Sequence, residues 1–436
     1  MLWAGRREIA RLAFPILYGE VVGVITPLVV VAIMGRVDEE ALYARSLYMP
    51  LAFLFIALQV GFEISNQVAA AVSRGSERPQ DVLPTAMNMI RVGAAVWGAL
   101  TLVIVICAPL IASLLEVPPG STGDFVSFVR WFCVANLLWL PLSLASSSLR
   151  GYGHARRAAG AVLLGAGVEV GVVAVLGFGT DIGMYTLPIA TAAGGGAGLA
   201  FAFAALVRTD IWRARGSLGR RPEAISSLAR VGGPVTISFL VIAVGNFSLI
   251  WVVAPFGPDV VSGFSAAATL EALILVPSTA IGSATAITMN RLRGAGRPDL
   301  LLPALRAGLG LAWLTYGVLA LLVWLPRAPL AALIAGAPDV AGQTEHLLTI
   351  VGLTYGCMGV TVTAIVILQQ IGGGLIALMM NLPYFLGSVA VGALIVESAG
   401  VQGLYWTVAV LNATGMLIAP LVVSRFVRRG FPGEAR

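Results

Sequence analysis

The segment GSERPQDVLP at residues 75–84 recurs as GAGRPDLLLP at residues 294–303, a shift of 219 positions. Three further pairs keep this register to within one residue: IARLAFP (9–15) with LARVGGP (228–234), SSLRGYG (147–153) with ILQQIGG (367–373), and GMYTLPIATAAG (183–194) with GLYWTVAVLNATG (403–415). Apolar segments resemble one another by chance, but chance does not keep one register with matched Gly, Arg and Pro. The chain is therefore predicted to repeat one structure twice.

The composition places both halves in a membrane. Of 436 residues, 58 % are hydrophobic and 11 % are charged, whereas soluble globular chains carry about 25 % charged residues. This excludes soluble enzymes, nucleic-acid-binding proteins and disordered proteins. A membrane-spanning helix needs about 20 apolar residues, and such runs recur along the sequence. The first, 12–34, is longer than the ~7–15-residue core of a signal peptide, so we expect a spanning helix there.

We predict an all-α polytopic membrane protein in the lipid bilayer, with six helices in each half. Because both halves begin on the same side, the repeat is parallel, as in many transporters. The predicted parts are an N-terminal six-helix lobe (1–207), a cytoplasmic linker (208–229) and a C-terminal six-helix lobe (230–436). The twelve helices are 9–34, 46–73, 84–115, 124–149, 158–178, 183–207, 230–255, 260–290, 303–326, 346–370, 373–396 and 402–424, with QQIGGG (369–374) dividing the tenth from the eleventh.

Arginines mark one side of the membrane. If the N-terminus is cytoplasmic, most arginines lie in the loops that follow even-numbered helices and in the C-terminal tail. The opposite side of the membrane keeps mainly Arg36, Arg45 and Arg327, beside acidic residues such as Asp38 and Asp259. The positive-inside rule then predicts two cytoplasmic termini in the cell (cytoplasmic) membrane, the inner membrane, and we expect a monomer. The cytoplasmic set is Arg6, Arg7, Arg11, Arg74, Arg78, Arg150, Arg156, Arg157, Arg208 to Arg221, Arg291, Arg293, Arg297, Arg425, Arg428, Arg429 and Arg436.

The sequence offers no pattern for bound metal or catalysis. Its two histidines, His154 and His346, lie in a loop and at a helix end, and no CxxC or HExxH spacing occurs. We therefore expect no metal site, no cofactor, no nucleic-acid partner and no enzymatic activity. The run Gly194-Gly195-Gly196-x-Gly198 follows no strand and predicts close helix packing instead of a phosphate-binding loop.

The order of several motifs resembles the multidrug and toxic compound extrusion (MATE) family over nearly the whole chain. Pro15 lies early in the first helix, Gly35-Arg36 precedes the first outer loop, LRGYG (149–153) closes the fourth helix, and Gly183 to Thr191 opens the sixth. APFG (254–257), Pro277 and GAGRP (294–298) repeat the scheme in the second half. The resemblance implies a secondary antiporter that exports organic, often cationic, compounds against an inward flow of protons or sodium.

The chain departs from the family at its known coupling positions. Where the first helix of the family often carries an Asp, this chain has Val30. Its seventh and tenth helices lack the carboxylates of the sodium-coupled NorM-like branch. Glu271 matches the acid in the eighth helix of the DinF-like branch, so the chain resembles a DinF-like or divergent member.

Four carboxylates lie deep within predicted spans: Glu20, Glu63, Glu169 and Glu271. Each costs roughly 2.5–3.5 kcal/mol at mid-bilayer, which makes it a functional candidate; the alternative is a protonated Glu that joins two helices. Counted from flanking arginines, the first three lie roughly 14–18 Å deep, near the middle of a ~30 Å core. We predict that these three form one proton- or cation-coupling cluster, that no arginine is deep enough to pair with them, and that Glu271 is secondary.

Further residues complete the predicted site. Pro27 and Gly23 are a candidate hinge in the first helix, or else a static kink. Asn66 lies three residues from Glu63 and shares its helix face. Asn66, Asn136 and Trp139 are candidates for substrate binding, although amides commonly join helices and tryptophans commonly anchor them.

The leading hypothesis is a proton-coupled exporter of small organic compounds, cationic or amphiphilic, that works by alternating access. One alternative is a lipid or lipid-linked oligosaccharide flippase of the same superfamily, for which fourteen spans and a basic cavity are typical. Another is sodium coupling in place of protons.

Overall fold

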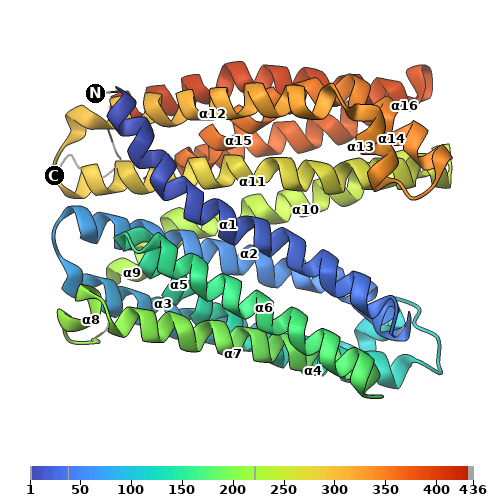
Figure 1. The fold of residues 1–436 in the computed structure, drawn as a ribbon, viewed down its shortest axis with the longest axis horizontal. Helices are drawn as coiled ribbons and strands as arrows, with labels where there is room; N and C mark the ends of the chain where they lie inside the picture. The colour runs from blue at the N-terminus through green and yellow to red at the C-terminus, as the bar shows by residue number, and fades with distance from the viewer. Residues whose placement is uncertain (1, 38, 220–221, 431–436) are drawn as a thin grey trace. The chain divides into compact units, whose positions relative to one another are not determined.

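The computed structural model describes residues 2–37, 39–219 and 222–430, which form helices and short turns with no β-strand among them (Figure 1). A bilayer offers the backbone no hydrogen-bond partners, and a helix satisfies its own N–H and C=O groups. Eleven segments of the described chain are long and apolar enough to cross a membrane. Four charged residues that entered the orientation argument, Asp38, Arg220, Arg221 and Arg436, lie outside the described residues.

The first half of the chain contains the six predicted spans and two short additional helices. The fourth span consists of two helices, α4 and α5, joined by a 3₁₀ turn at Asn136–Leu138. The predicted linker contains the short helices α8 and α9. The bounds are α1 (Leu2–Met34), α2 (Glu39–Gly75), α3 (Val82–Leu114), α4 (Thr122–Ala135), α5 (Trp139–Tyr152), α6 (Ala155–Gly179), α7 (Thr186–Val207), α8 (Asp210–Arg213) and α9 (Pro222–Ser227).

The second half contains the other six spans, although its last three are not separated by loops. The tenth and eleventh form one apolar segment, Pro338–Val396, broken within the predicted QQIGGG boundary where Gly372 has φ 98°. Gly400, with φ 63°, separates the eleventh from the twelfth. The bounds are α10 (Gly233–Val253), α11 (Pro258–Gly294), α12 (Leu301–Trp324), α13 (Arg327–Ile334), α14 (Pro338–Val351), α15 (Tyr355–Leu368) and α16 (Gly374–Arg429).

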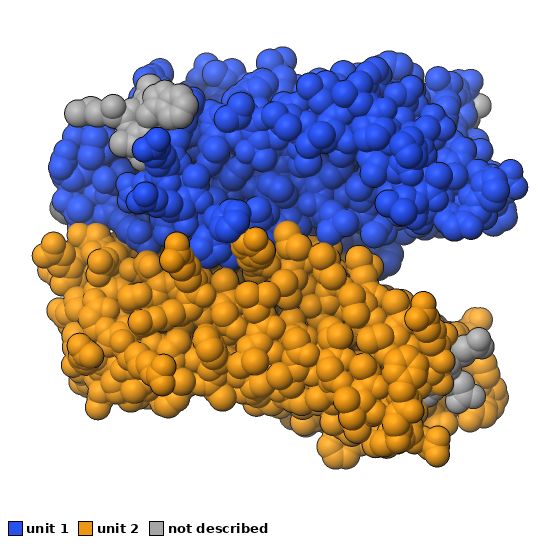
Figure 2. Space-filling model, in the orientation of Figure 1, with its two compact units in different colours: residues 1–17, 233–436 blue, residues 18–232 orange. Residues whose placement is uncertain are grey.

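The chain divides into two compact units (Figure 2). One comprises residues 18–232; the other comprises residues 1–17 together with 233–436. The predicted lobes, 1–207 and 230–436, divide the chain by its internal repeat, and that assignment stays a prediction.

Glycines bring α6 and α7 into close contact within the unit 18–232. A Cβ on Gly165 would lie 2.9 Å from the carbonyl oxygen of Gly194, and one on Gly194 would lie 2.7 Å from that of Gly165. Neither position can carry a side chain without separating the helices. The glycine run 194–198 therefore mediates helix packing, which confirms the prediction made for it.

Candidate functional site

Arg150 is held at the end of α5 by a glycine-dependent helix stop. Gly153 follows α5 in a left-handed conformation, φ 119°. The N–H of His154 donates to the carbonyl of Leu149 at 2.7 Å, and the N–H of Gly153 donates to that of Arg150 at 3.2 Å. This is a Schellman motif, which satisfies the last carbonyls of the helix. It fixes Arg150 in the final turn of α5.

The guanidinium of Arg150 contacts two of the predicted carboxylates. Its Nη2 atom donates to Oε1 of Glu63 in a direct ion pair. Its Nη1 atom lies 3.8 Å from Oε1 of Glu20. The structure thus brings Glu20 of α1 and Glu63 of α2 together around one cation from α5. We call Glu20, Glu63 and Arg150 the acid–arginine triad.

The expectation that no arginine reaches these acids is therefore wrong. The sequence pattern places Arg150 among the loop charges, because LRGYG closes a helix. However, Cα–Cβ bonds tilt toward the N-terminus of a helix, so a long side chain in the last turn extends back along the span. Arginine also buries its stem along apolar surface. The side chain of Arg150 is 13 % exposed.

Asn66 and Gly151 hold α5 against α2 beside the triad. Asn66 is buried, and its Nδ2 group donates to the carbonyl of Leu144 at 2.8 Å and to the hydroxyls of Ser147 and Ser148 at 2.9 and 2.8 Å. A Cβ on Gly151 would overlap the carbonyl oxygen of Gln67. Asn66 joins the two helices, and its role in substrate binding stays a prediction.

Glu169 has a different set of partners. On α6, it accepts a hydrogen bond of 3.1 Å from the Thr191 hydroxyl of α7. The carbonyl of Thr191 accepts one of 3.3 Å from Trp139 Nε1. The positive charge that acts on Glu169 is that of Arg45, whereas Arg150 and Glu63 act on Glu20. Two of the three predicted acids therefore meet in the triad, and the third faces Thr191.

Three further candidates in this unit are Asn136, Gly23 and Pro27. Asn136, in the turn between α4 and α5, donates to the carbonyl of Phe132 at 3.0 Å and to the Tyr48 hydroxyl at 3.5 Å. α1 is helical through both Gly23 and Pro27. A Cβ on Gly23 would meet nothing within 4 Å. The hinge and the substrate-binding roles stay predictions.

Glu271 lies in the other unit, on α11. Its charge acts on the phenols of Tyr355 and Tyr384. Tyr384 donates to Oδ1 of Asn412 at 2.9 Å, and Nδ2 of Asn412 donates to the Thr354 hydroxyl at 3.1 Å. Glu271 therefore belongs to a polar environment of its own.

A second charged cluster lies outside the spans. Asp210 lies at the start of α8. Its Oδ1 atom is 3.5 Å from Nε2 of His154, and its Oδ2 atom is 3.5 Å from Nη1 of Arg74. Burial, with the nearby charges of Arg157 and Arg74, lowers the pKa of His154 despite its hydrogen bond to Asp210. Partial burial of Asp210 raises its pKa, but hydrogen bonds lower it by more. The first of these is the hydrogen bond with His154, and the pKa of Asp210 lies below its usual range.

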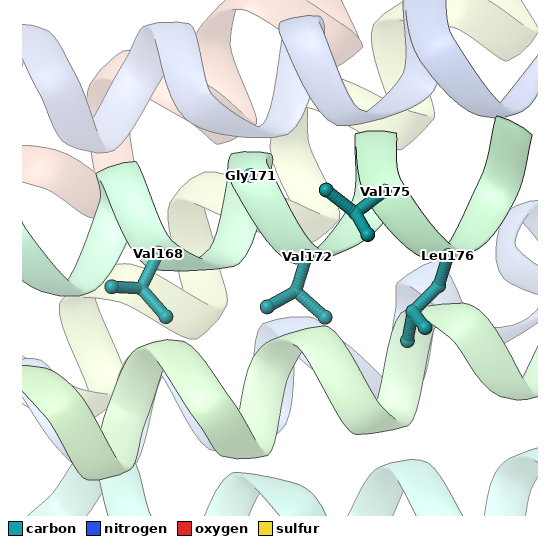
Figure 3. Close-up of a pocket in the computed structure, with 5 residues that line it drawn as sticks. All are labelled: Val168, Gly171, Val172, Val175 and Leu176. Atoms are coloured by element: carbon teal, nitrogen blue, oxygen red, sulfur yellow. The ribbon is translucent and has the colours of Figure 1, made fainter. Parts of the chain in front are cut away.

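A metal site and a surface hollow are the alternatives to the triad as candidate sites within the described residues. The described residues contain no group of three His, Cys, Asp or Glu side chains that could hold a metal ion. A shallow hollow follows α6, where Val168, Val172 and Leu176 point the same way beside Gly171 and Val175 (Figure 3). Its lining is apolar and comes from one helix, so it offers no group to recognise or protonate.

The sequence identifies the acids as candidates but not the partners that the structure places beside them. Arg150 and Arg45 were assigned to loops, and Thr191 was noted only as part of a motif. A usable signal for Arg150 was its place in the last turn of a helix, where a side chain points back into the span. Thr191 becomes recognisable only once α6 and α7 are packed.

Comparisons with known proteins match this architecture. Residues 15–176 and 234–418 match the MatE family model. The chain is 28 % identical to a Deinococcus radiodurans protein named "Probable multidrug resistance protein NorM", over 98 % of this chain and 96 % of that one. A mutant of the Vibrio cholerae MATE transporter VcmN superposes with a TM-score of 0.91 at 19 % identity, covering 98 % of both chains. A MOP superfamily transporter from Pyrococcus furiosus gives 0.89 at 18 % identity, covering 97 % of this chain and 96 % of that one.

The fold is thus that of the MATE transporters. The chain belongs to the MatE family. The predicted family and fold class are confirmed, and the matched proteins are named as transporters or resistance proteins. The DinF-like or divergent branch stays a prediction.

Proposed function

We propose that this protein is a multidrug exporter that moves small cationic or amphiphilic organic compounds out of the cell in exchange for protons. The observation that carries the proposal is the acid–arginine triad. With both carboxylates ionised, its net charge is −1; with one of them protonated, it is neutral. A site that changes charge in this way can bind a proton and a cation alternately, which is the requirement for antiport by alternating access.

The triad favours protons over sodium as the coupling ion. Hard metal cations are bound by sets of oxygen ligands. Here a guanidinium occupies the place between the two carboxylates where such an ion would bind. The acids also outnumber the arginine, so the site attracts a cation, whereas a flippase of lipid-linked anions needs a basic cavity. We therefore rank sodium-coupled export and lipid flipping below proton-coupled export.

The direct test uses the purified protein in proteoliposomes with ethidium, a fluorescent lipophilic cation. We expect a pH gradient alone to drive ethidium transport and a sodium gradient alone to drive none. Ethidium transport driven by a sodium gradient alone would show that sodium is the coupling ion. If neither gradient drives ethidium transport, the result would favour the flippase.

We also propose a monomer in the cytoplasmic membrane with both termini inside, on the basis of the arginine distribution. Cross-linking in native membranes tests the first part, and the labelling experiment described below tests the second.

A further inference from the structure

We propose, resting on the function proposed above, that Arg150 gives the two acids different tasks. Arg150 holds Glu63 as a fixed counter-ion and leaves Glu20 as the carboxylate that takes up and releases the coupled proton. Arg150 and Glu63 are positioning residues in this scheme. The proton passes from water to a Glu20 carboxylate oxygen and back to water on the other side, and only this O–H bond forms and breaks.

The two contacts of the guanidinium are unequal. Nη2 bonds Glu63 directly, whereas Nη1 stands 3.8 Å from Glu20, at the limit of an ion pair. Protonation of Glu63 would weaken a direct charge-assisted hydrogen bond, which is the stronger kind. Protonation of Glu20 gives up only the longer contact. The side chain of Glu20 is also 38 % exposed, against 21 % for Glu63, so the protein encloses Glu20 less tightly.

The helices reinforce this difference. Arg150 and Glu63 lie on α5 and α2, which are joined by the hydrogen bonds of Asn66 and by the close approach at Gly151. Their ion pair therefore lies within one packed pair of helices. Glu20 is on α1, and the triad is the contact that links its carboxylate to that pair.

Other charged groups on the helices packed against α2 and α5 are engaged elsewhere or face outward. Arg91 of α3 donates to the carbonyl of Leu218, Arg130 of α4 donates to that of Val105, and Glu169 of α6 accepts from Thr191. Arg156, Arg157 and Arg230 are exposed. The charges acting on Glu20 are those of Arg150 and Glu63. The Arg150–Glu63 pair is neutral as a unit, so the net charge of the triad follows Glu20.

The experiment compares single and paired substitutions in proteoliposomes under a pH gradient. Glu63→Gln alone leaves Glu20 as the one carboxylate of the triad that balances Arg150. We expect ethidium transport to fall at least about tenfold, because protonation of Glu20 would then leave a buried charge uncompensated, which is strongly unfavourable. The pair Glu63→Gln with Arg150→Gln removes both charges together and should recover at least about half of the transport. The pair Glu20→Gln with Arg150→Gln also removes one charge of each sign and should recover none. Arg156→Gln, at an exposed arginine, is the matched control.

A second measurement covers the case in which a paired variant does not fold. In detergent, adding ethidium to the wild-type protein should release protons, and Glu20→Gln should release none. Glu8→Gln, an exposed carboxylate on the same helix, should release protons as the wild type does. Recovery by both paired variants, or proton release from Glu20→Gln, would overturn the assignment. Failure of the wild-type protein itself to respond to a pH gradient would overturn the proposed function instead.

Discussion

The Nη1 atom of Arg150 lies 3.8 Å from Oε1 of Glu20, while Nη2 of the same guanidinium bonds Glu63. One cation thus serves two carboxylates from two different helices. An ion pair of one Arg and one Glu is neutral and could remain unchanged through a transport cycle. A second Glu leaves the group with one unit of negative charge, which either a proton or a cationic substrate can neutralise.

Close packing of α6 on α7 predicts different effects at two neighbouring glycines. A Cβ on Gly165 would lie 2.9 Å from the carbonyl oxygen of Gly194, whereas one on Gly167 would meet nothing within 4 Å. We expect Gly165→Ala to destabilise the protein by about 1–3 kcal/mol through overpacking. Gly167→Ala, the control, should leave the melting temperature in detergent unchanged or raise it slightly. Equal melting temperatures for both variants would contradict the packing.

The cluster outside the spans predicts a pH dependence of stability. Because burial lowers the pKa of His154 in the folded protein, the folded state binds this proton less readily than the unfolded state. The stability associated with neutral His154 is present above the ordinary histidine pKa of about 6.5 and is lost as pH falls through the lower, folded pKa. Asp210, whose pKa is also lowered, adds a loss at still lower pH.

His154→Gln tests this assignment. The variant lacks the titrating group. The melting temperature of the variant should therefore rise relative to that of the wild type when the pH is lowered from about 7.5 to about 5.5. A constant difference between the two proteins across this range would show that His154 does not contribute.

The topology predicts which side of the membrane two single cysteines face. In a background without Cys107, Cys133 and Cys357, a cysteine at Ser217 should react with an impermeant maleimide only from the cytoplasmic side. One at Asp259 should react only from outside. Reversed labelling would be incompatible with the proposed orientation.

Glu271→Gln should have a milder effect than substitutions in the triad. Glu271 lies in the other compact unit, close to the phenols of Tyr355 and Tyr384, and is not a member of the triad. We expect weaker substrate affinity or an altered pH profile, with proton-driven transport retained. Complete loss of transport in a normally expressed variant would make Glu271 the principal proton carrier.

Most of the fold was predictable because a bilayer permits few structures. Apolar runs of spanning length must be helices, and the repeated Gly, Arg and Pro positions divide them into two sets of six. The divisions at Gly372 and Gly400 were also predictable, since a run of glycines in QQIGGG and the break before residue 402 interrupt the apolar pattern. The short helices α8 and α9 were not predicted, because the sequence around them is rich in charge.

The site was predictable only in its acids. A carboxylate inside a membrane is costly enough to be noticed one residue at a time, and this identified Glu20 and Glu63. The partner of these acids depends on how closely α5 approaches α2, which Gly151 and Asn66 determine through contacts between segments about 80 residues apart. Residue spacing along one helix carries no information about such an approach, so Arg150 was mistaken for a loop charge.

The most direct test of the account is proton-driven efflux by Glu20→Gln and Glu63→Gln in proteoliposomes, with substrate counterflow measured in parallel. Counterflow exchanges labelled for unlabelled substrate without a proton gradient, so it reports folding and substrate binding. We predict that both variants insert normally and that neither variant accumulates ethidium under a pH gradient. Glu169→Gln should be less affected, because Glu169 faces Thr191 and not the triad. If Glu20→Gln and Glu63→Gln both transport normally across a pH gradient, the triad is a structural ion pair and this mechanism is wrong.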